Sequence, residues 1–347
     1  MEQCLNCGFH QAPFNLKDTN LIFSKSFSFD IFMPVMNTQL KKILANVSLG
    51  LVIQIQINAT QQEQPTKLSE NFDEVKVKSL KINESIYVLK SEGGGVIGGN
   101  VGVCVGKDGT FIIDDSFAKL SDKFKNAISK LTDKKVNFVV NTHFHFDHTD
   151  GNESFGKDGA IIISQANSRS RMMKDIVFPL FKKRQNAYSE VGLPKITLDK
   201  ALKFHYNGHT INILHFGPAH TDGDLVIQFK ESNVVHLGDL LIDYGFPFID
   251  VPNGGSVDGF IATLEKISNM INDETVIIPG HGDLAKKSDL LEFKKMLKTI
   301  RDRISKGIED GKTLGQIAES NPTKGFELGG PIPVNEFVKI IYSSLVN

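Results

Sequence analysis

From about residue 76, short apolar runs alternate with turn-forming residues along the chain. Glycine, asparagine and aspartate separate the runs, which is typical of strands joined by tight turns. In the first half the expected strands are 85–90, 101–105, 110–114, 136–140 and 160–163. The second half adds expected strands at 201–206, 210–216, 224–229, 233–237 and 275–278. The pattern predicts a protein rich in short strands, with a hairpin turning at 106–109.

Other segments carry apolar residues every three or four positions, which predicts amphipathic helices. The expected helices are 117–131, 165–188, 257–271, 288–308, 314–320 and 334–345. The second of these is rich in lysine and arginine, which we interpret as a solvated helix face. Two halves that each contain strands and helices favour a core of two sheets with helices outside.

The N-terminal part of the chain has a different pattern. Met36 is soon followed by two lysines and then by an uncharged, mostly apolar run, the layout of a secretory signal. We therefore predict that 1–35 are an upstream extension outside the mature protein, that 36–59 are a signal peptide and that 60–74 are a flexible linker. The mature protein would be periplasmic or secreted, with no stable membrane anchor after signal removal.

Composition narrows the possible functions only slightly. The chain has 347 residues, 40% hydrophobic and 23% charged, with a formal net charge of -1. These values are typical of a globular protein, and they give no basic excess for binding nucleic acid. The cysteines are Cys4, Cys7 and Cys104, and they imply no disulfide framework. We expect the partner to be a small-molecule substrate, and the oligomeric state stays open.

The segment 141–148 concentrates four possible metal ligands directly after an apolar run. Side chains alternate in an extended segment, so His143, His145 and Asp147 can project to one side, with His148 following where the loop turns. Four such groups in one short loop would repel one another or stay unsatisfied without a positive charge between them. The segment therefore predicts a metal site.

Distant residues complete two sites. A first metal needs three protein ligands and an open position, and we assign His143, His145 and His220 to it. A second metal would take Asp147 and His148, with His281 as its third ligand and Asp239 as a carboxylate shared by both ions. These three distant residues follow apolar runs and have glycine nearby, which permits tight turns. Asp147 is also our candidate catalytic residue, orienting the nucleophile or taking its proton.

Several other polar residues are interpreted as structural. A single histidine is more often a core or surface residue than a ligand, and two nearby aspartates resemble turn and capping residues. These residues are His205, His209, His215, His236, Asp222 and Asp224.

The motif Thr142-His-x-His-x-Asp-His148, followed by His220, Asp239 and His281, resembles the metallo-β-lactamase superfamily. The resemblance covers about 75–285 and implies an α/β fold of α+β type, a four-layer αββα sandwich. Two mixed sheets would face each other, with helices outside and the metals at one edge. It also implies Zn²⁺ at both sites, two ions per chain. We expect 286–347 to form helices packed on the same domain.

The same resemblance bears on the substrate. Zinc β-lactamases usually have cysteine or serine where this chain has Asp239, which instead resembles the bridging aspartate of glyoxalase II. One β-lactamase group has a lysine three residues later, where this chain has Ile242. The segment 238–250 resembles an exported, β-lactamase-like branch of metallo-hydrolases. We expect a dinuclear zinc hydrolase in which metal-bound hydroxide attacks a small ester, thioester or cyclic amide.

Two alternatives remain. One is a true metallo-β-lactamase acting on β-lactam antibiotics. The other, from a different class, is an iron-dependent dioxygenase on the same fold, against which the intact His148 and His281 argue. Tyr244 and Phe246 either wall the substrate pocket or belong to the core, and the sequence leaves both interpretations open.

Overall fold

The computed structural model describes residues 70–326 and 328–346. The predicted upstream extension, the predicted signal peptide and most of the predicted linker lie outside these residues. The last part of that linker, 70–74, is held on the domain instead. The backbone N–H of Asn71 donates to the carbonyl of Gly94 at 2.8 Å, and the Lys123 ammonium donates to the carbonyls of Phe72 and Asp73. The end of the predicted linker therefore contacts the domain.

The first sheet has seven strands in the order β1-β2-β3-β4-β5-β6-β9. The strands are β1 (Lys76–Lys81), β2 (Ile86–Glu92), β3 (Val101–Gly106), β4 (Gly109–Ile113), β5 (Val136–Val140), β6 (Ile161–Gln165) and β9 (Ile196–Leu198). Strands β1 to β4 pair antiparallel, and β4, β5, β6 and β9 pair parallel. The hairpin expected at 106–109 is the β3–β4 turn.

The second sheet has five strands in chain order. They are β10 (Ala201–Tyr206), β11 (His209–Leu214), β12 (Val226–Phe229), β13 (Val234–Ile242) and β14 (Val276–His281). Only β13 and β14 pair parallel, and their register shifts on both sides of Gly238. Apolar side chains from both sheets meet in one core, in which Phe111 of β4 packs edge-on against Phe229 of β12.

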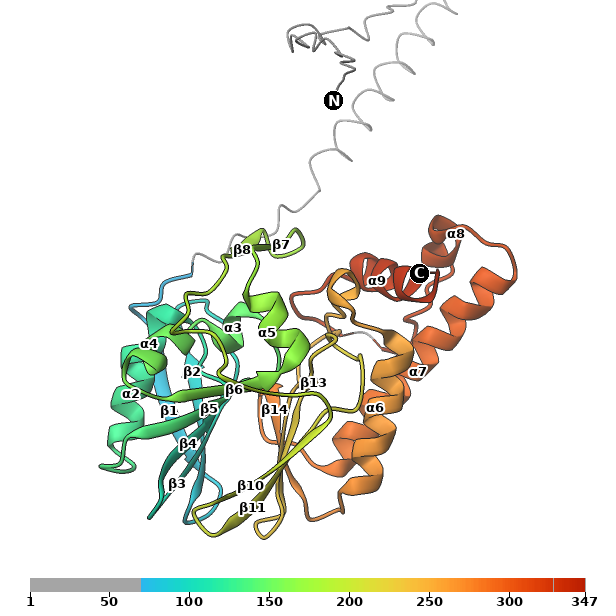
Figure 1. Ribbon diagram of the computed structural model, residues 1–347. Helices are drawn as coiled ribbons and strands as arrows, with labels where there is room; N and C mark the ends of the chain where they lie inside the picture. The colour runs from blue at the N-terminus through green and yellow to red at the C-terminus, as the bar shows by residue number, and fades with distance from the viewer. Residues whose placement is uncertain (1–69, 327, 347) are drawn as a thin grey trace, which may run out of the picture. The chain divides into compact units, whose positions relative to one another are not determined.

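Helices cover the outer faces of the two sheets (Figure 1). On the first sheet lie α2 (Ser121–Ser129) and α4 (Asn152–Lys157), and on the second lie α6 (Val257–Met270) and α7 (Lys287–Glu309). The other helical elements are η3 (Ala118–Leu120), α3 (Phe146–Thr149), α5 (Ala166–Met172), η4 (Val251–Asn253), α8 (Leu314–Glu319) and α9 (Val334–Val346). The predicted four-layer αββα sandwich is confirmed. No helix in the described part of the chain is both long and apolar enough to cross a membrane.

The helix predicted over 165–188 is wrong beyond its first turns. After α5 ends, β7 (Ile176–Phe178) and β8 (Lys183–Gln185) form a separate antiparallel hairpin. The β-branched residues Ile176 and Val177 favour a strand, and Pro179 cannot donate the backbone hydrogen bond that a helix needs. The basic residues of this segment do not form one helix face, since Arg171 pairs with Asp222 in another loop.

The C-terminal helix α9 packs against the loop after β13 through a buried ring pair. Phe337 of α9 is fully buried and stacks on Phe246, with ring centroids 4.5 Å apart and planes 15° apart. We expect Phe337→Ala to lower the free energy of unfolding by about 3–5 kcal/mol, because a buried aromatic ring leaves a cavity. Urea unfolding followed by circular dichroism measures this. Val334→Ala on the same helix is the control: Val334 is 42% exposed, so its loss should stay within about 0.5 kcal/mol.

Candidate metal centre

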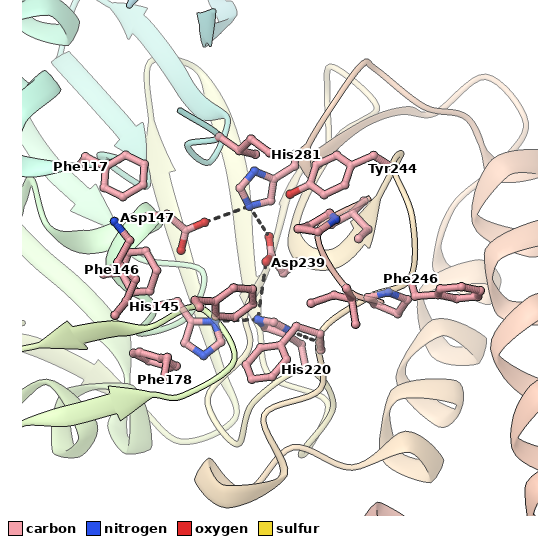
Figure 2. A pocket seen from close by; sticks show the side chains of 18 of the residues that line it. Phe117, His145, Phe146, Asp147, Phe178, His220, Asp239, Tyr244, Phe246 and His281 are labelled. Carbon is pink, nitrogen blue, oxygen red and sulfur yellow. Dashed lines mark hydrogen bonds and ion pairs between the residues drawn. The ribbon is translucent and has the colours of Figure 1, made fainter. Parts of the chain in front are cut away.

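The predicted ligands come from both sheets and meet at one edge of the sandwich. His143 and His145 follow β5, while Asp147 and His148 lie on the short helix α3. His220 lies between β11 and β12, and the others come from strand ends: Asp239 lies in β13, and His281 is the last residue of β14. Figure 2 shows Asp239 between His220 and His281, with Asp147 beside His281.

Local backbone geometry aims these side chains. The Thr142 N–H and hydroxyl both donate to the Asp114 carboxylate, at 2.7 and 2.8 Å, which holds the start of the histidine loop. Gly238 adopts φ +51°, and a Cβ there would lie 2.5 Å from Thr142 Oγ1. Only glycine fits this approach without strain. The resulting irregularity in β13 turns Asp239 toward the histidines.

The seven side chains form overlapping groups with ligand atoms within 4.8 Å of one another. One group is His143, His145 and His220, the predicted first site, and another is Asp147, His148 and His281, the predicted second site. Asp239 lies between them. Its Oδ1 is 3.1 Å from His148 Nε2 and its Oδ2 is 3.6 Å from His220 Nε2. One carboxylate oxygen therefore faces each group, as a bridging ligand requires.

Hydrogen bonds outside the cluster set the orientation of three imidazoles. His148 Nδ1 lies 2.8 Å from Asp114 Oδ2, and His145 Nε2 lies 2.9 Å from Asp250 Oδ2. His220 Nδ1 lies 2.6 Å from the carbonyl oxygen of Phe248. Each of these nitrogens donates its N–H outward, because a carbonyl or carboxylate oxygen only accepts. In the neutral form of each ring, the other nitrogen therefore presents a lone pair to the centre.

The inward nitrogens are close to one another. His145 Nδ1 is 3.0 Å from His220 Nε2, and His148 Nε2 is 3.1 Å from His281 Nε2. His143 donates from Nδ1 to Thr142 Oγ1 at 3.0 Å, which leaves its buried Nε2 without a hydrogen-bond partner in the described residues. Lone pairs repel at such distances unless a proton or a cation lies between them. The donor set of imidazoles and carboxylates suits zinc and similar divalent ions.

The charges of the cluster follow from burial and from neighbouring groups. Burial lowers the pKa of His143 well below its usual range and that of His220 to about 4, so both rings are neutral ligands. Burial alone would also lower the pKa of His148, but Asp239, Asp147 and Asp114 outweigh it and raise that pKa. Burial would raise the pKa of Asp239, yet His281 and His148 hold it well below the usual value. The Asp239 carboxylate is therefore ionised at neutral pH.

A cavity of about 250 Å³ opens onto the ligands. Tyr244 lines it, with its ring 5.6 Å from that of His281, whereas the Phe246 ring points away and is buried against α9 (Figure 2). Of the two residues left open by the sequence, Tyr244 thus faces the cavity and Phe246 is mainly core. Phe178, Phe181 and further rings also line the cavity, and sequence reasoning missed them. Their only signal was the abundance of phenylalanine, 25 residues in the chain.

The residues interpreted as structural lie outside the ligand groups. His236 Nε2 donates to the carbonyl of Asn100 at 3.2 Å, and its Nδ1 accepts from the Gly238 N–H at 3.2 Å. Asp224 accepts hydrogen bonds from Thr221, as expected of a turn residue. The structural residues that sequence reasoning did not find are Asp114 and Asp250, which orient two ligand rings.

Removing Asp250 should weaken metal binding while the ligand residues stay intact. We expect Asp250→Ala to lower zinc affinity by about 10- to 100-fold, because His145 loses the acceptor that holds its tautomer. Competition with a chelator indicator measures this affinity. Exposed Asp199→Ala is the matched control and should bind zinc like the parent protein. Equal affinity in both variants would contradict the orienting role.

His236 should make the protein sensitive to acid. Burial lowers its pKa to about 4, so the folded state keeps the ring neutral while the unfolded state takes up a proton below about pH 6.5. Its contribution to stability is complete above pH 6.5 and is lost as pH falls toward 4, by up to about 3 kcal/mol. Urea unfolding of the parent protein and of His236→Gln at pH 5 and pH 8 should show a smaller pH effect in the variant. An identical pH effect would disprove the assignment.

Comparisons with known proteins agree with this geometry. Residues 94–281 match the family model of the metallo-β-lactamase superfamily. A probable metallo-hydrolase of Methanocaldococcus jannaschii is 28% identical over 157 residues, 44% of this chain and 72% of that protein. The metallo-β-lactamase type 2 of Elizabethkingia meningoseptica is 25% identical over 231 residues, 65% of this chain and 83% of that protein. The structure of a metallo-β-lactamase from Pontibacter korlensis has the same fold, with a TM-score of 0.55 and 17% identity over 64% of this chain and 99% of that one. The chain therefore belongs to the metallo-β-lactamase superfamily and is a metal-dependent hydrolase.

Proposed function

We propose that the protein is an exported, dinuclear zinc hydrolase that cleaves a small ester, thioester or cyclic amide. The observation that carries the proposal is the position of Asp239, with one oxygen toward each ligand group. A carboxylate placed in this way can bind one ion through each oxygen. The complete second group of Asp147, His148 and His281 supports the same conclusion.

Two zinc ions, when bound, would supply a water of lowered pKa and a positive charge for the developing oxyanion. The chain's own residues supply the rest. Burial would raise the pKa of Asp147, but His148 and His281 lower it, so its carboxylate is ionised and able to accept a proton. Its Oδ2 lies 3.1 Å from His281 Nε2, and its side chain is 18% exposed toward the cavity. We assign to Asp147 the orientation of the nucleophile and the acceptance of its proton.

A true β-lactamase is the second candidate, favoured by the long match to the Elizabethkingia meningoseptica protein. The position three residues after the bridging aspartate argues against it in this chain. Ile242 is 8% exposed and lines the cavity, so no charge is present there to bind a substrate carboxylate. The export of the chain is proposed on the signal-like pattern alone, and the mass of the mature N-terminus in its host tests it.

Asp239→Ala tests the dinuclear assignment. We expect the parent protein to hold two zinc ions per chain, and the variant to lose at least one of them together with about 100-fold or more of kcat/KM. Elemental analysis and turnover of a panel of thioesters, lactones and nitrocefin measure both quantities, and circular dichroism checks the fold. Exposed Asp273→Ala is the control and should match the parent. One iron per chain would overturn the zinc assignment, and full activity of Asp239→Ala would exclude the bridging role.

A further inference from the structure

Aromatic rings from separate segments form a continuous wall beside the first ligand group. We call Phe117, Phe146, Phe178, Phe181 and Phe248 the aromatic wall. Phe117 lies 5.9 Å from Phe146, which lies 5.4 Å from Phe178, and Phe181 lies 5.1 Å from Phe248, all between ring centroids. Phe178 and Phe248 both approach the His145 ring, at 5.2 and 5.9 Å. The aromatic wall is therefore adjacent to the candidate ligand His145, and Figure 2 shows Phe146 and Phe178 beside it.

The opposite side of the cavity is also mainly apolar. Ile242 and Ile332 line it together with Tyr244 beside His281. Ile97, from the glycine-rich loop after β2, lines the mouth although it is 49% exposed. Apart from the metal ligands, the cavity thus offers few polar partners to a bound molecule. An apolar group entering it gains free energy from leaving water, whereas an unpaired charge loses its hydration without compensation.

Among the described residues that line the cavity there is one lysine and there are no arginines. That residue, Lys183, lies on the β7–β8 hairpin, and its ammonium is 2.5 Å from Glu70 Oε2. A substrate carboxylate that approached this cation would meet the like charge of Glu70. Glu70 neutralises Lys183, and Ile242 is apolar. A substrate anion therefore finds no free cation among the described residues that line the cavity.

The size of the cavity limits the apolar group. A cavity of roughly 150 Å³ accommodates a benzene ring. The volume here is about 250 Å³, enough for one ring or a short alkyl chain beside the scissile bond. A large peptide-like or glutathione-like group would extend into solvent.

We propose that the substrate is a neutral ester or thioester whose acyl group is an aryl-substituted or short alkyl group held by the aromatic wall. This substrate class rests on the proposed hydrolase function. Metal ions held by the two ligand groups would polarise the carbonyl, Asp147 orients the attacking water and accepts its proton, and the wall selects the acyl group by its apolar area. Water adds to the carbonyl carbon, the bond to the alcohol or thiol breaks, and the leaving group takes up the proton.

S-acyl thioesters of N-acetylcysteamine test the proposal with zinc-loaded protein, because their leaving group is small, polar and neutral. We expect kcat/KM to rise about threefold per methylene from acetyl to pentanoyl, until the cavity is filled. Phenylacetyl should rank with the best, and the hemisuccinyl thioester should react at least tenfold more slowly than pentanoyl. A hemisuccinyl substrate that equals pentanoyl, or rates independent of chain length, would overturn the proposed substrate class.

Two variants examine the proposed contacts. Phe181→Ala should reduce the ratio of pentanoyl to acetyl turnover several-fold, whereas Val177→Ala should keep it, since Val177 lies on the same hairpin, outside this cavity, and is 60% exposed. Glu70→Gln releases Lys183 and should raise the hemisuccinyl to pentanoyl ratio several-fold. An unchanged ratio in Phe181→Ala would remove the wall from substrate selection, and an unchanged ratio in Glu70→Gln would exclude charge neutralisation at Lys183.

A binding measurement separates the two proposals. Saturation-transfer NMR should detect binding of phenylacetamide, a neutral analogue that is not turned over, and much weaker binding of succinamate. Protein that binds phenylacetamide in this way but hydrolyses none of the esters, thioesters and lactones would retain the apolar subsite and refute the hydrolase function. Protein that hydrolyses thioesters but prefers succinamate would retain the function and refute the subsite.

Discussion

The site depends on imidazole rings that are fixed in the orientation that brings their lone pairs together. His145 and His220 face each other at 3.0 Å, and His148 and His281 at 3.1 Å. This arrangement is unfavourable without a cation, so the protein must hold it with bonds made elsewhere. The carboxylates of Asp114 and Asp250 and the carbonyl of Phe248 provide those bonds, and each is paired with the outward nitrogen of one ring. The free energy of metal binding is therefore coupled to the free energy of folding.

The ligands belong to different sheets, so the packing of the sandwich sets the distance between them. Asn100, at the start of β3, connects the two sheets beside His281. Its backbone N–H donates to the carbonyl of Gly280 at 2.7 Å, and its side-chain amide donates to the carbonyls of Pro279 and Gly282 at 2.9 and 3.1 Å. These three bonds enclose the last ligand of β14 from both sides. A small shift between the sheets would thus move His281 relative to Asp147 and His148.

The sequence predicted the parts of the molecule that depend on local order. The motif at 141–148 is contiguous, and the distant candidate ligands follow apolar runs, so the clustering of these seven side chains and most strands of both sheets could be inferred. The edge strands β1 and β9 were not among the expected strands. The β7–β8 hairpin could not, because Met172, Ile176 and Leu180 recur at helical spacing across Pro179. Asp114 and Asp250 were missed for another reason. An aspartate that accepts a hydrogen bond from a distant imidazole looks like any turn or strand-end aspartate until the fold brings the two together.

The reaction and the choice of substrate are separated in this structure. The ligands lie on strand ends and on α3, where the hydrogen bonds of two sheets keep them in place. Most of the aromatic wall instead comes from the β7–β8 hairpin and from the loop that follows β13, outside both sheets. A change at Phe181, in the turn of the hairpin, would alter the apolar area available to the substrate and leave the ligand-bearing segments unchanged, whereas a change in the strands would move the ligands for every substrate. The proposed substrate class thus places the selection among acyl groups in the segment 176–185, while the candidate metal centre would act on all of them alike.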